Sequence, residues 1–377
     1  MLAVLAVALA LAASTADDLR AAQQLAWNKQ FDRAAAIYRR ILRDEPSNVD
    51  ARKGLATMEY WTGDFRSAQR DFDLVLRTRP DDTDSRRALI DIAAASAPVI
   101  ESHDELTTDD QPMRRNVWLA SYTQFTDPLT TWTATGGAYV LAAGNRATAP
   151  FAQLAVNSAI PSLHLRATAA LRALRFPDDR TMPLGSLSIS REWSHSSLTA
   201  GIERHELLYT KSSLHSHPNE FAGSVSWQQR DDHDSSAATL RIIHYFDHND
   251  GRAFDAYHLR SLTPFLSIGA SASYRDTDES RFDGARYDPY WTPRNLVETR
   301  AIAATTIHAR RTTLSLHADA GWAHDHDQLS RTFHPWRLFA DIAIPLRGTF
   351  NATAGVERQS TVFYRANTIR FGFSGRL

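Results

Sequence analysis

Fifteen histidines make metal binding the first chemistry to consider in this chain of 377 residues. The densest cluster is His324-Asp325-His326-Asp327, and His215 and His217 form a second pair. Imidazole and carboxylate groups are good ligands for divalent metals. Both clusters fall between segments of regular pattern, where polar residues are expected in any case. We therefore predict no metal site and no cofactor.

A histidine and a serine also stand two residues apart, at His195 and Ser197. Some lipid-hydrolysing enzymes use such a pair for nucleophilic attack. The sequence assigns no carboxylate partner to this pair, and it shows no phosphate-binding loop, Gly-x-Ser-x-Gly elbow or paired-acid motif. We predict that the chain is not an enzyme, and an enzyme acting on lipid is kept as an alternative.

A larger group of charged residues alternates with apolar residues along extended segments. In Leu163–Ala173 the odd positions are leucine or alanine, whereas the even positions include two arginines. Side chains in a strand point to opposite faces with a period of two, so each segment has one apolar and one polar face. The polar faces supply the candidate binding residues Arg166, Arg172, Arg241, His317, Asp319, Arg337 and Asp341. The aromatic residues Trp193, Trp227, Tyr245 and Trp322 are interpreted mainly as girdle residues at a membrane surface, with sugar stacking as the alternative.

Segments of this kind fill residues 115–377 and predict an antiparallel transmembrane β-barrel in the outer membrane. We count fifteen candidate strands, but single-chain bacterial barrels have even numbers. Short and long connections alternate along the chain, and short turns are expected on the periplasmic side. With the amino terminus in the periplasm, this pattern requires that the number of strands before Ala149 is wrong by one. We predict sixteen strands, with fourteen as the alternative. In the last strand, Ile369, Phe371 and Phe373 share one face, which is typical of the carboxyl-terminal strand of such barrels.

The amino terminus predicts export. Leu2–Ala13 is an apolar run, and small residues follow it at Ser14 and Ala16, so residues 1–16 are interpreted as a signal peptide. The net charge of −1 argues against a nucleic-acid partner, and the absence of cysteine excludes disulfides and thiolate metal sites. Residues 98–114, which contain two prolines and several acidic residues, are predicted to be an extended linker.

Residues 17–97 contain an internal repeat with a period of 34 residues, the period of the tetratricopeptide repeat. The matching positions, which we predict to form a partner-binding repeat, are Phe31, Ala34, Tyr38 and Pro46 in the first copy and Phe65, Ala68, Phe72 and Pro80 in the second. Stacked helical repeats commonly bind a peptide or a protein on a concave face. A spacer, or the remnant of a longer array, is an equally weighted alternative.

A signal peptide, tetratricopeptide repeats and then a barrel resemble the layout of the exopolysaccharide exporters for cellulose and poly-N-acetylglucosamine. The stretch Tyr290-Trp291-Thr292-Pro293-Arg294 resembles a Tyr-aromatic-Ser-Pro-polar motif that opens a late barrel strand in the cellulose exporters. Those exporters carry many more repeats, so the compact YaiO family is the nearer resemblance. The resemblance implies an outer-membrane protein whose helical repeats lie in the periplasm.

The sequence thus predicts an α+β protein of two domains, with helical repeats followed by an outer-membrane barrel. The function that we expect is passive passage or export of a polysaccharide or another polar solute, with a periplasmic protein docked on the repeats. The alternatives are a structural or adhesion barrel with a closed lumen and a barrel enzyme acting on outer-membrane lipid.

Overall fold

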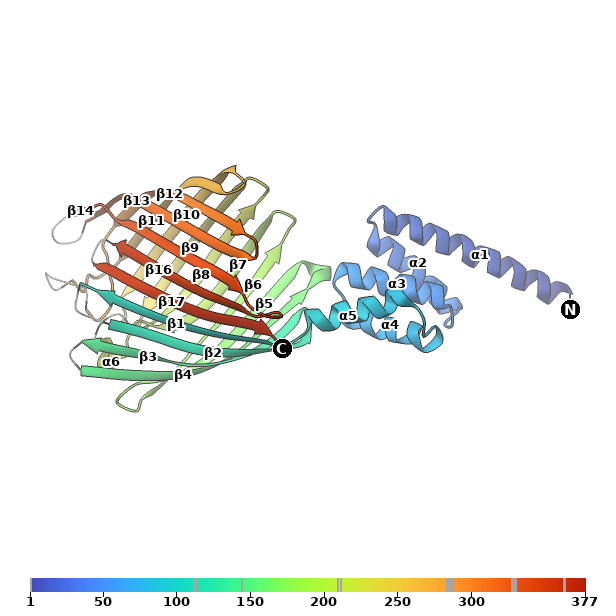
Figure 1. Ribbon diagram of the computed structural model, residues 1–377, viewed down its shortest axis with the longest axis horizontal. Helices are drawn as coiled ribbons and strands as arrows, with labels where there is room; N and C mark the ends of the chain where they lie inside the picture. Colours follow the sequence, from blue (N-terminus) through green and yellow to red (C-terminus); the bar gives the residue numbers. More distant parts are fainter. Residues whose placement is uncertain are drawn as a thin grey trace. The chain divides into compact units, whose positions relative to one another are not determined.

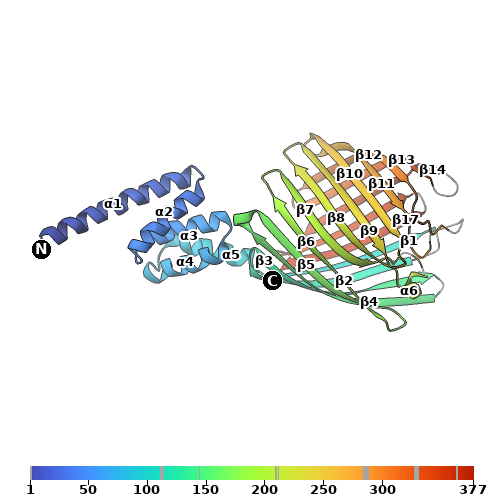
Figure 2. The ribbon, with the colours of Figure 1, turned by 180° about the vertical axis from the view of Figure 1, so that it is seen from behind.

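The computed structural model describes residues 2–110, 114–143, 145–208, 210, 212–282, 288–326, 331–361 and 364–377. The chain forms two compact units (Figures 1 and 2). One unit contains the helices that precede Pro98, and the other is a β-barrel. The predicted α+β fold of two domains is confirmed.

The helical unit consists of antiparallel helices that pack through small and aromatic side chains. The helices are α1 Leu2–Trp27, α2 Phe31–Asp44, α3 Val49–Thr62, α4 Phe65–Thr78 and α5 Thr83–Ala95. Ala34 and Tyr38 are buried in one core cluster, and Ala68 and Phe72 are buried in another. The Tyr38 ring lies directly against Gly54, where a Cβ atom would be only 2.4 Å from the ring. These residues therefore hold the helices together.

The repeat is visible in its hydrogen bonds as well as in its core. Asn48 accepts a hydrogen bond from the backbone N–H of Ala51 and so caps α3, and Asp82 does the same for Ser85 at the start of α5. Both are favoured capping residues. The prolines that follow α2 and α4 are exposed, and their carbonyls accept hydrogen bonds from the arginines of the next helix, as Pro46 does from Arg52 at 2.7 Å.

The barrel is a single antiparallel sheet that closes on itself. Its strands are β1 Val99–Asp109, β2 Arg114–Asp127, β3 Thr130–Ala143, β4 Asn145–Ile160, β5 Leu165–Arg175, β6 Thr181–Glu192, β7 Ser196–Glu206, β8 Asn219–Arg230, β9 Asp234–Tyr245, β10 Asp250–Thr263, β11 Leu266–Thr277, β12 Leu296–Ala309, β13 Thr312–Asp325, β14 Arg331–Phe333, β15 Trp336–Pro345, β16 Asn351–Ser360 and β17 Arg365–Arg376. Both β14 and β15 pair with β13, and Pro335 lies between them, so they count as one strand. The result is the predicted barrel of sixteen strands.

The segment predicted to be a linker, residues 98–114, instead contains strand β1. This strand pairs with β17 along its whole length and with β2 on its other side, so it closes the barrel. The prediction was wrong because the outer face of β1 carries Ser102 and Asp104 and lacks a regular apolar row. Its inner face is polar too, so no alternation is visible in the sequence. Strand β1 is therefore the sixteenth strand, the one that was missing before Ala149 from the fifteen candidates counted in the sequence.

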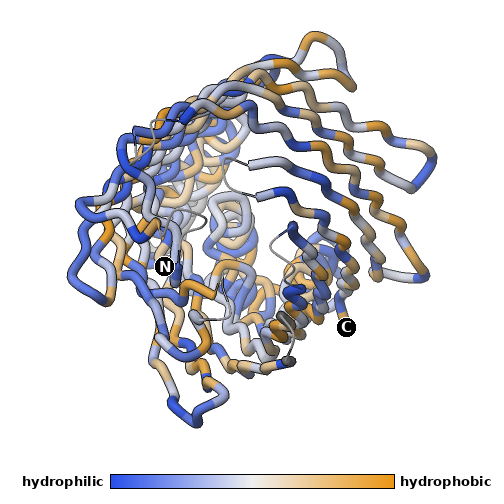
Figure 3. Tube along the Cα trace, turned by 90° about the vertical axis from the view of Figure 1, so that its left-hand side faces the viewer, coloured by the Kyte–Doolittle hydropathy of each residue, from blue (hydrophilic) through white to orange (hydrophobic). Residues whose placement is uncertain are grey.

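Apolar and polar residues alternate along the strands, as Figure 3 shows along the Cα trace. On β13, Leu316 and Trp322 are exposed on the outer surface, whereas Asp319 is 4% exposed and faces the lumen. On β15, Leu338 and Ile344 are exposed outward, and Arg337 faces the lumen. Outward apolar residues facing lipid and inward polar residues are the pattern of a membrane barrel.

The two ends of the barrel differ in the length of their connections. Turns of a few residues join β6 to β7, β8 to β9 and β12 to β13 at one end. The other end carries longer connections, including 207–218 between β7 and β8 and 278–295 between β11 and β12. The chain enters β1 at Val99, and β1 pairs there with the last residues of β17, so the helical unit is joined to the short-turn end.

Helix α1 runs without a break through the predicted cleavage position between Ala16 and Asp17. Within the described part of the chain, no helix combines the length and the apolar character needed to cross a membrane. The signal peptide at residues 1–16 stays a prediction.

Candidate functional site: the barrel lumen

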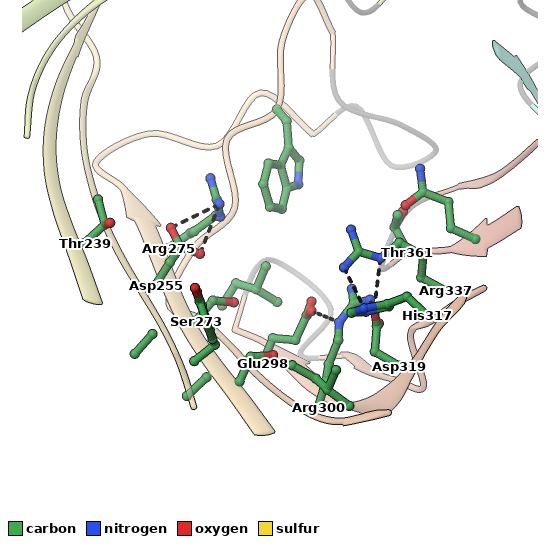
Figure 4. A pocket seen from close by; sticks show the side chains of 18 of the residues that line it. Thr239, Asp255, Ser273, Arg275, Glu298, Arg300, His317, Asp319, Arg337 and Thr361 are labelled. Atoms are coloured by element: carbon green, nitrogen blue, oxygen red, sulfur yellow. Dashed lines mark hydrogen bonds and ion pairs between the residues drawn. The ribbon is translucent and has the colours of Figure 1, made fainter. Parts of the chain in front are cut away.

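The inward faces of the strands enclose a cavity of about 960 Å³ (Figure 4). Its wall is built mainly by β9 to β13, together with residues of the connection 278–295. Threonine, serine and charged side chains line it, among them Thr239, Ser273 and Thr361. Alternation along each strand positions these groups, because every second residue must point into the barrel.

A network of opposite charges lies on one side of this cavity. Asp319 on β13 is bound by Arg300 on β12 at 2.5 Å and by Arg337 on β15 at 2.9 Å. His317 contacts the same carboxylate at 2.9 Å, and Glu298 is paired with Arg300. Figure 4 shows these side chains gathered at one side of the pocket. A carboxylate that is 4% exposed is stable here because two arginines pair with it.

A second charge pair and an indole ring line the same cavity. Asp255 on β10 lies 3.3 Å from Arg275 on β11, and Figure 4 shows this pair apart from the Asp319 network. The guanidinium of Arg275 also lies 5.3 Å from the centre of the Trp291 ring, within the range of a cation–π contact. The cavity therefore combines hydrogen-bonding groups with an aromatic surface.

Charge pairing continues around the rest of the inner wall. Arg172 on β5 donates to Glu206 at 2.7 Å. Arg241 on β9 lies 2.8 Å from both Glu203 and Glu220. Three other inward arginines have similar partners: Arg166 pairs with Glu192 at 2.9 Å, Arg370 with Glu357 at 2.9 Å, and Arg115 with Glu105 at 3.8 Å. Each of these arginines thus has a carboxylate partner on the wall.

The connection 278–295 is anchored to the inside of the barrel through Tyr290, which is 1% exposed. Its ring centre lies 4.6 Å from that of Tyr245 on β9, and its hydroxyl donates to Asp247 at 2.6 Å. Burial, and then the hydrogen bond to Asp247, raises the pKa of Tyr290, so the hydroxyl stays a donor at neutral pH. Thr210, in the connection 207–218, donates to Asp288 at 2.9 Å and joins the two connections.

The connection 207–218 also folds onto the inner wall, through apolar contacts. Leu208 and Leu214 are 4% and 2% exposed and pack in one cluster with Leu174, Phe176 and Phe151. Apolar side chains of this connection therefore pack against the inner wall at the long-loop end of the lumen. The charged side chains of the cavity lie mainly on the strands.

All seven residues that the sequence assigned to the polar face lie on the inner wall, where Asp341 on β15 is 3.5 Å from Arg370. Six further charged residues of the cavity were not identified from the sequence: Asp109, Arg115, Asp255, Arg275, Glu298 and Arg300. The same alternation could have revealed those on β10, β11 and β12. The roles of all these residues in binding stay a prediction. Of the four aromatic residues considered for a girdle, Trp193, Trp227 and Trp322 are exposed, and Tyr245 packs inside against Tyr290.

The residues of the predicted family motif support the fold at this site. Thr292 is fully buried and its hydroxyl accepts a hydrogen bond from the backbone N–H of Arg281 at 2.6 Å. The Pro293 carbonyl accepts from the N–H of Thr277, and Arg294 donates to the carbonyl of Asp278 at 2.7 Å. The motif thus fixes Trp291 in the wall of the cavity.

The other candidate groups are not assembled into a site within the described part of the chain. No group of three or more metal-ligating side chains is close enough to hold a metal ion among the described residues. His217 lies 3.0 Å from Asp178, and the rings of His324 and His326 are 4.4 Å apart. Asp327 lies outside the described residues. Ser197 pairs in register with Glu192, whose carboxylate is held by Arg166.

Of the residues predicted to bind a partner, Ala34, Tyr38, Ala68 and Phe72 are buried in the helical unit itself. Phe31 and Phe65 are partly buried, and their rings contact Trp61 and Tyr60 at 5.5 Å and 5.7 Å. The recurring positions therefore define the packing of the repeat. The binding of a partner to this repeat stays a prediction.

Comparison with known proteins supports both units. Residues 28–90 match the family model for the tetratricopeptide repeat. A solved structure described as a bacterial polysaccharide outer membrane secretin is similar, with a TM-score of 0.59 and 11% identity, covering 75% of this chain and 99% of that one. CdiB from Acinetobacter baumannii is similar with a TM-score of 0.50 and 7% identity, covering 74% of this chain and 60% of that one. No curated protein matches the chain.

At these low identities the structural comparisons show the fold alone, and the repeat model matches the helical unit alone. Together with the closed sheet and its apolar outer face, they identify the architecture. The chain consists of a tetratricopeptide module followed by an outer-membrane β-barrel of sixteen strands.

Proposed function

We propose that this protein is a passive channel of the outer membrane for a polysaccharide or a similar polar solute. The observation that carries the proposal is the inner wall, where paired charges and hydroxyl groups surround a cavity of about 960 Å³. Such groups can replace the water contacts of a polar solute without a chemical step. The similar barrel described as a polysaccharide secretin supports the same class of solute.

The helical unit is proposed to lie in the periplasm and to dock a periplasmic protein. It is joined to the short-turn end of the barrel, and short turns face the periplasm in outer-membrane barrels. Tetratricopeptide repeats commonly present a surface for a peptide or protein. Membership of the YaiO family, which the compact layout with few repeats resembles, is part of this proposal.

Two measurements test the channel. Purified protein in a planar lipid bilayer is expected to give single-channel currents, and a deletion strain is expected to secrete less exopolysaccharide. A barrel without current would instead favour the structural or adhesion alternative. The enzyme alternative requires that Ser197→Ala abolishes a lipid-modifying activity, and we expect no such activity to be lost.

A further inference from the structure

We propose that the cavity is a binding subsite for an uncharged polyhydroxylated solute, with Trp291 as its apolar platform. A segment of neutral polysaccharide is the ligand class that fits. The inference rests on the proposed channel function and specifies which solute that channel favours.

Charge compensation is the first argument. Asp255 is paired with Arg275, and Asp319 is paired with Arg300 and Arg337. A strongly charged solute would have to separate such pairs and leave a partner uncompensated, which is costly in a partly buried site. Hydroxyl groups can donate to the carboxylates and accept from the guanidinium groups while the pairs stay intact. The wall therefore favours a neutral ligand rich in hydroxyls.

The aromatic surface is the second argument. Trp291 is partly buried, lines the cavity and packs against the apolar cluster of Leu296 and Ala323. The C–H faces of a sugar ring are apolar and pack well on an indole, while the hydroxyls at the ring edge reach neighbouring polar groups. Arg275 and Asp255 stand next to the indole and supply those groups.

The platform is also held in place before any ligand arrives. The residue before Trp291, Tyr290, is hydrogen-bonded to Asp247, and the residue after it, Thr292, is fully buried. A preorganised surface loses little conformational freedom on binding. The cavity volume lies near the upper end of the range for small-molecule sites, about 300–1,000 Å³, and so admits more than one sugar unit.

The experiment measures the block of ionic current through the full-length protein in planar bilayers by three soluble hexamers. These are maltohexaose, which is neutral, hexagalacturonate, which is anionic, and a glucosamine hexamer, which is cationic. Maltohexaose is expected to bind most tightly. Trp291→Ala should weaken its binding roughly tenfold, which corresponds to about 1.4 kcal/mol, whereas Trp291→Phe should retain most of it. The matched control is Trp322→Ala, on the outer surface, which should leave the block unchanged.

A second variant tests charge compensation directly. Asp255→Asn removes the partner of Arg275 and should increase the affinity for hexagalacturonate while maltohexaose still binds. Equal block by all three hexamers, or an unchanged block in Trp291→Ala, would overturn the inference while leaving the channel intact. A folded protein without any current would overturn the proposed function, and the inference with it.

Discussion

At the residue scale, the main feature of this barrel is the set of ion pairs between side chains on its inner wall. Asp319 is closely enclosed, since Arg300, Arg337 and His317 surround a carboxylate that is 4% exposed. Asp341, in contrast, has a side chain that is 40% exposed and lies 3.5 Å from Arg370. The two residues are on the inner faces of neighbouring strands, so they form a matched pair for mutation.

We predict that Asp319→Asn destabilises the barrel far more than Asp341→Asn. Removal of the Asp319 charge leaves Arg300 and Arg337 without a shared partner, and breaking a buried ion pair typically costs about 3–5 kcal/mol. Unfolding of the purified protein in detergent, followed by the shift of the folded band on a gel, measures the difference. Equal stability of the two variants would show that the network does not stabilise the wall.

A second residue-scale prediction concerns Glu59 on α3, which is 5% exposed. Burial, followed by the nearby carboxylates of Asp71 and Asp64, raises the pKa of Glu59 to about 7 from an ordinary value of 4.5. The folded state therefore holds this proton up to a higher pH than the unfolded state. As a consequence, this group lowers the stability of the helical unit as pH rises from about 4.5 to 7, by roughly 3 kcal/mol in full.

Glu59→Gln should accordingly stabilise the helical unit above pH 7 and have little effect near pH 4. Thermal melting of the helical circular-dichroism signal in the full-length protein measures this at both values. Asp84→Asn is the control, because the Asp84 side chain is 80% exposed. A stabilisation by Glu59→Gln that is equal at both pH values would rule out the titration as its cause.

At the element scale, the alternation of apolar and polar residues along each strand predicted most of the barrel from the sequence. It placed Arg337 and Asp319 inside and Leu316 and Leu338 outside, because alternation along a strand depends only on the local chain. The missing strand, β1, has polar residues on both faces and is held by pairing with β17 and β2. Such a strand depends on the closure of the whole sheet, and no local pattern could reveal it.

The position of Trp291 in the cavity could not be predicted from the sequence either, because it too depends on contacts between distant residues. The indole of Trp291 enters the cavity because the connection 278–295 is anchored at Tyr290 by the distant residues Tyr245 and Asp247. Contacts between residues more than forty positions apart have no signature in one sequence. The repeat of the helical unit, in contrast, could be predicted because its packing recurs every 34 residues.

The register itself can be tested on β13. Leu316→Arg should destabilise the barrel by about 2–4 kcal/mol if the residue lies near the membrane midplane, because it would place a charge in lipid. Ser315→Arg should be tolerated, since Ser315 is opposite Asp341 on the inner face. Ile342→Arg on β15 should behave like Leu316→Arg. Equal effects at Leu316 and Ser315, measured in the same unfolding assay, would contradict the assignment of faces.

At the scale of the whole molecule, the proposed function depends on the orientation of the barrel. The chain contains no cysteine, so single cysteines can report the side of the membrane without background labelling. Positions must be exposed in the folded protein. Ser213 is fully buried and Asp327 lies outside the described residues, whereas the side chain of Arg180 is 74% exposed in the connection between β5 and β6.

The most direct test is therefore labelling of whole cells with a membrane-impermeant maleimide. Arg180→Cys, at the long-loop end, should react in intact cells. Gln69→Cys on α4 and His233→Cys in the turn between β8 and β9 are both exposed and should react only after the outer membrane is opened. Labelling of Gln69→Cys in intact cells, with Arg180→Cys protected, would place the helical unit outside the cell and contradict the proposed periplasmic docking.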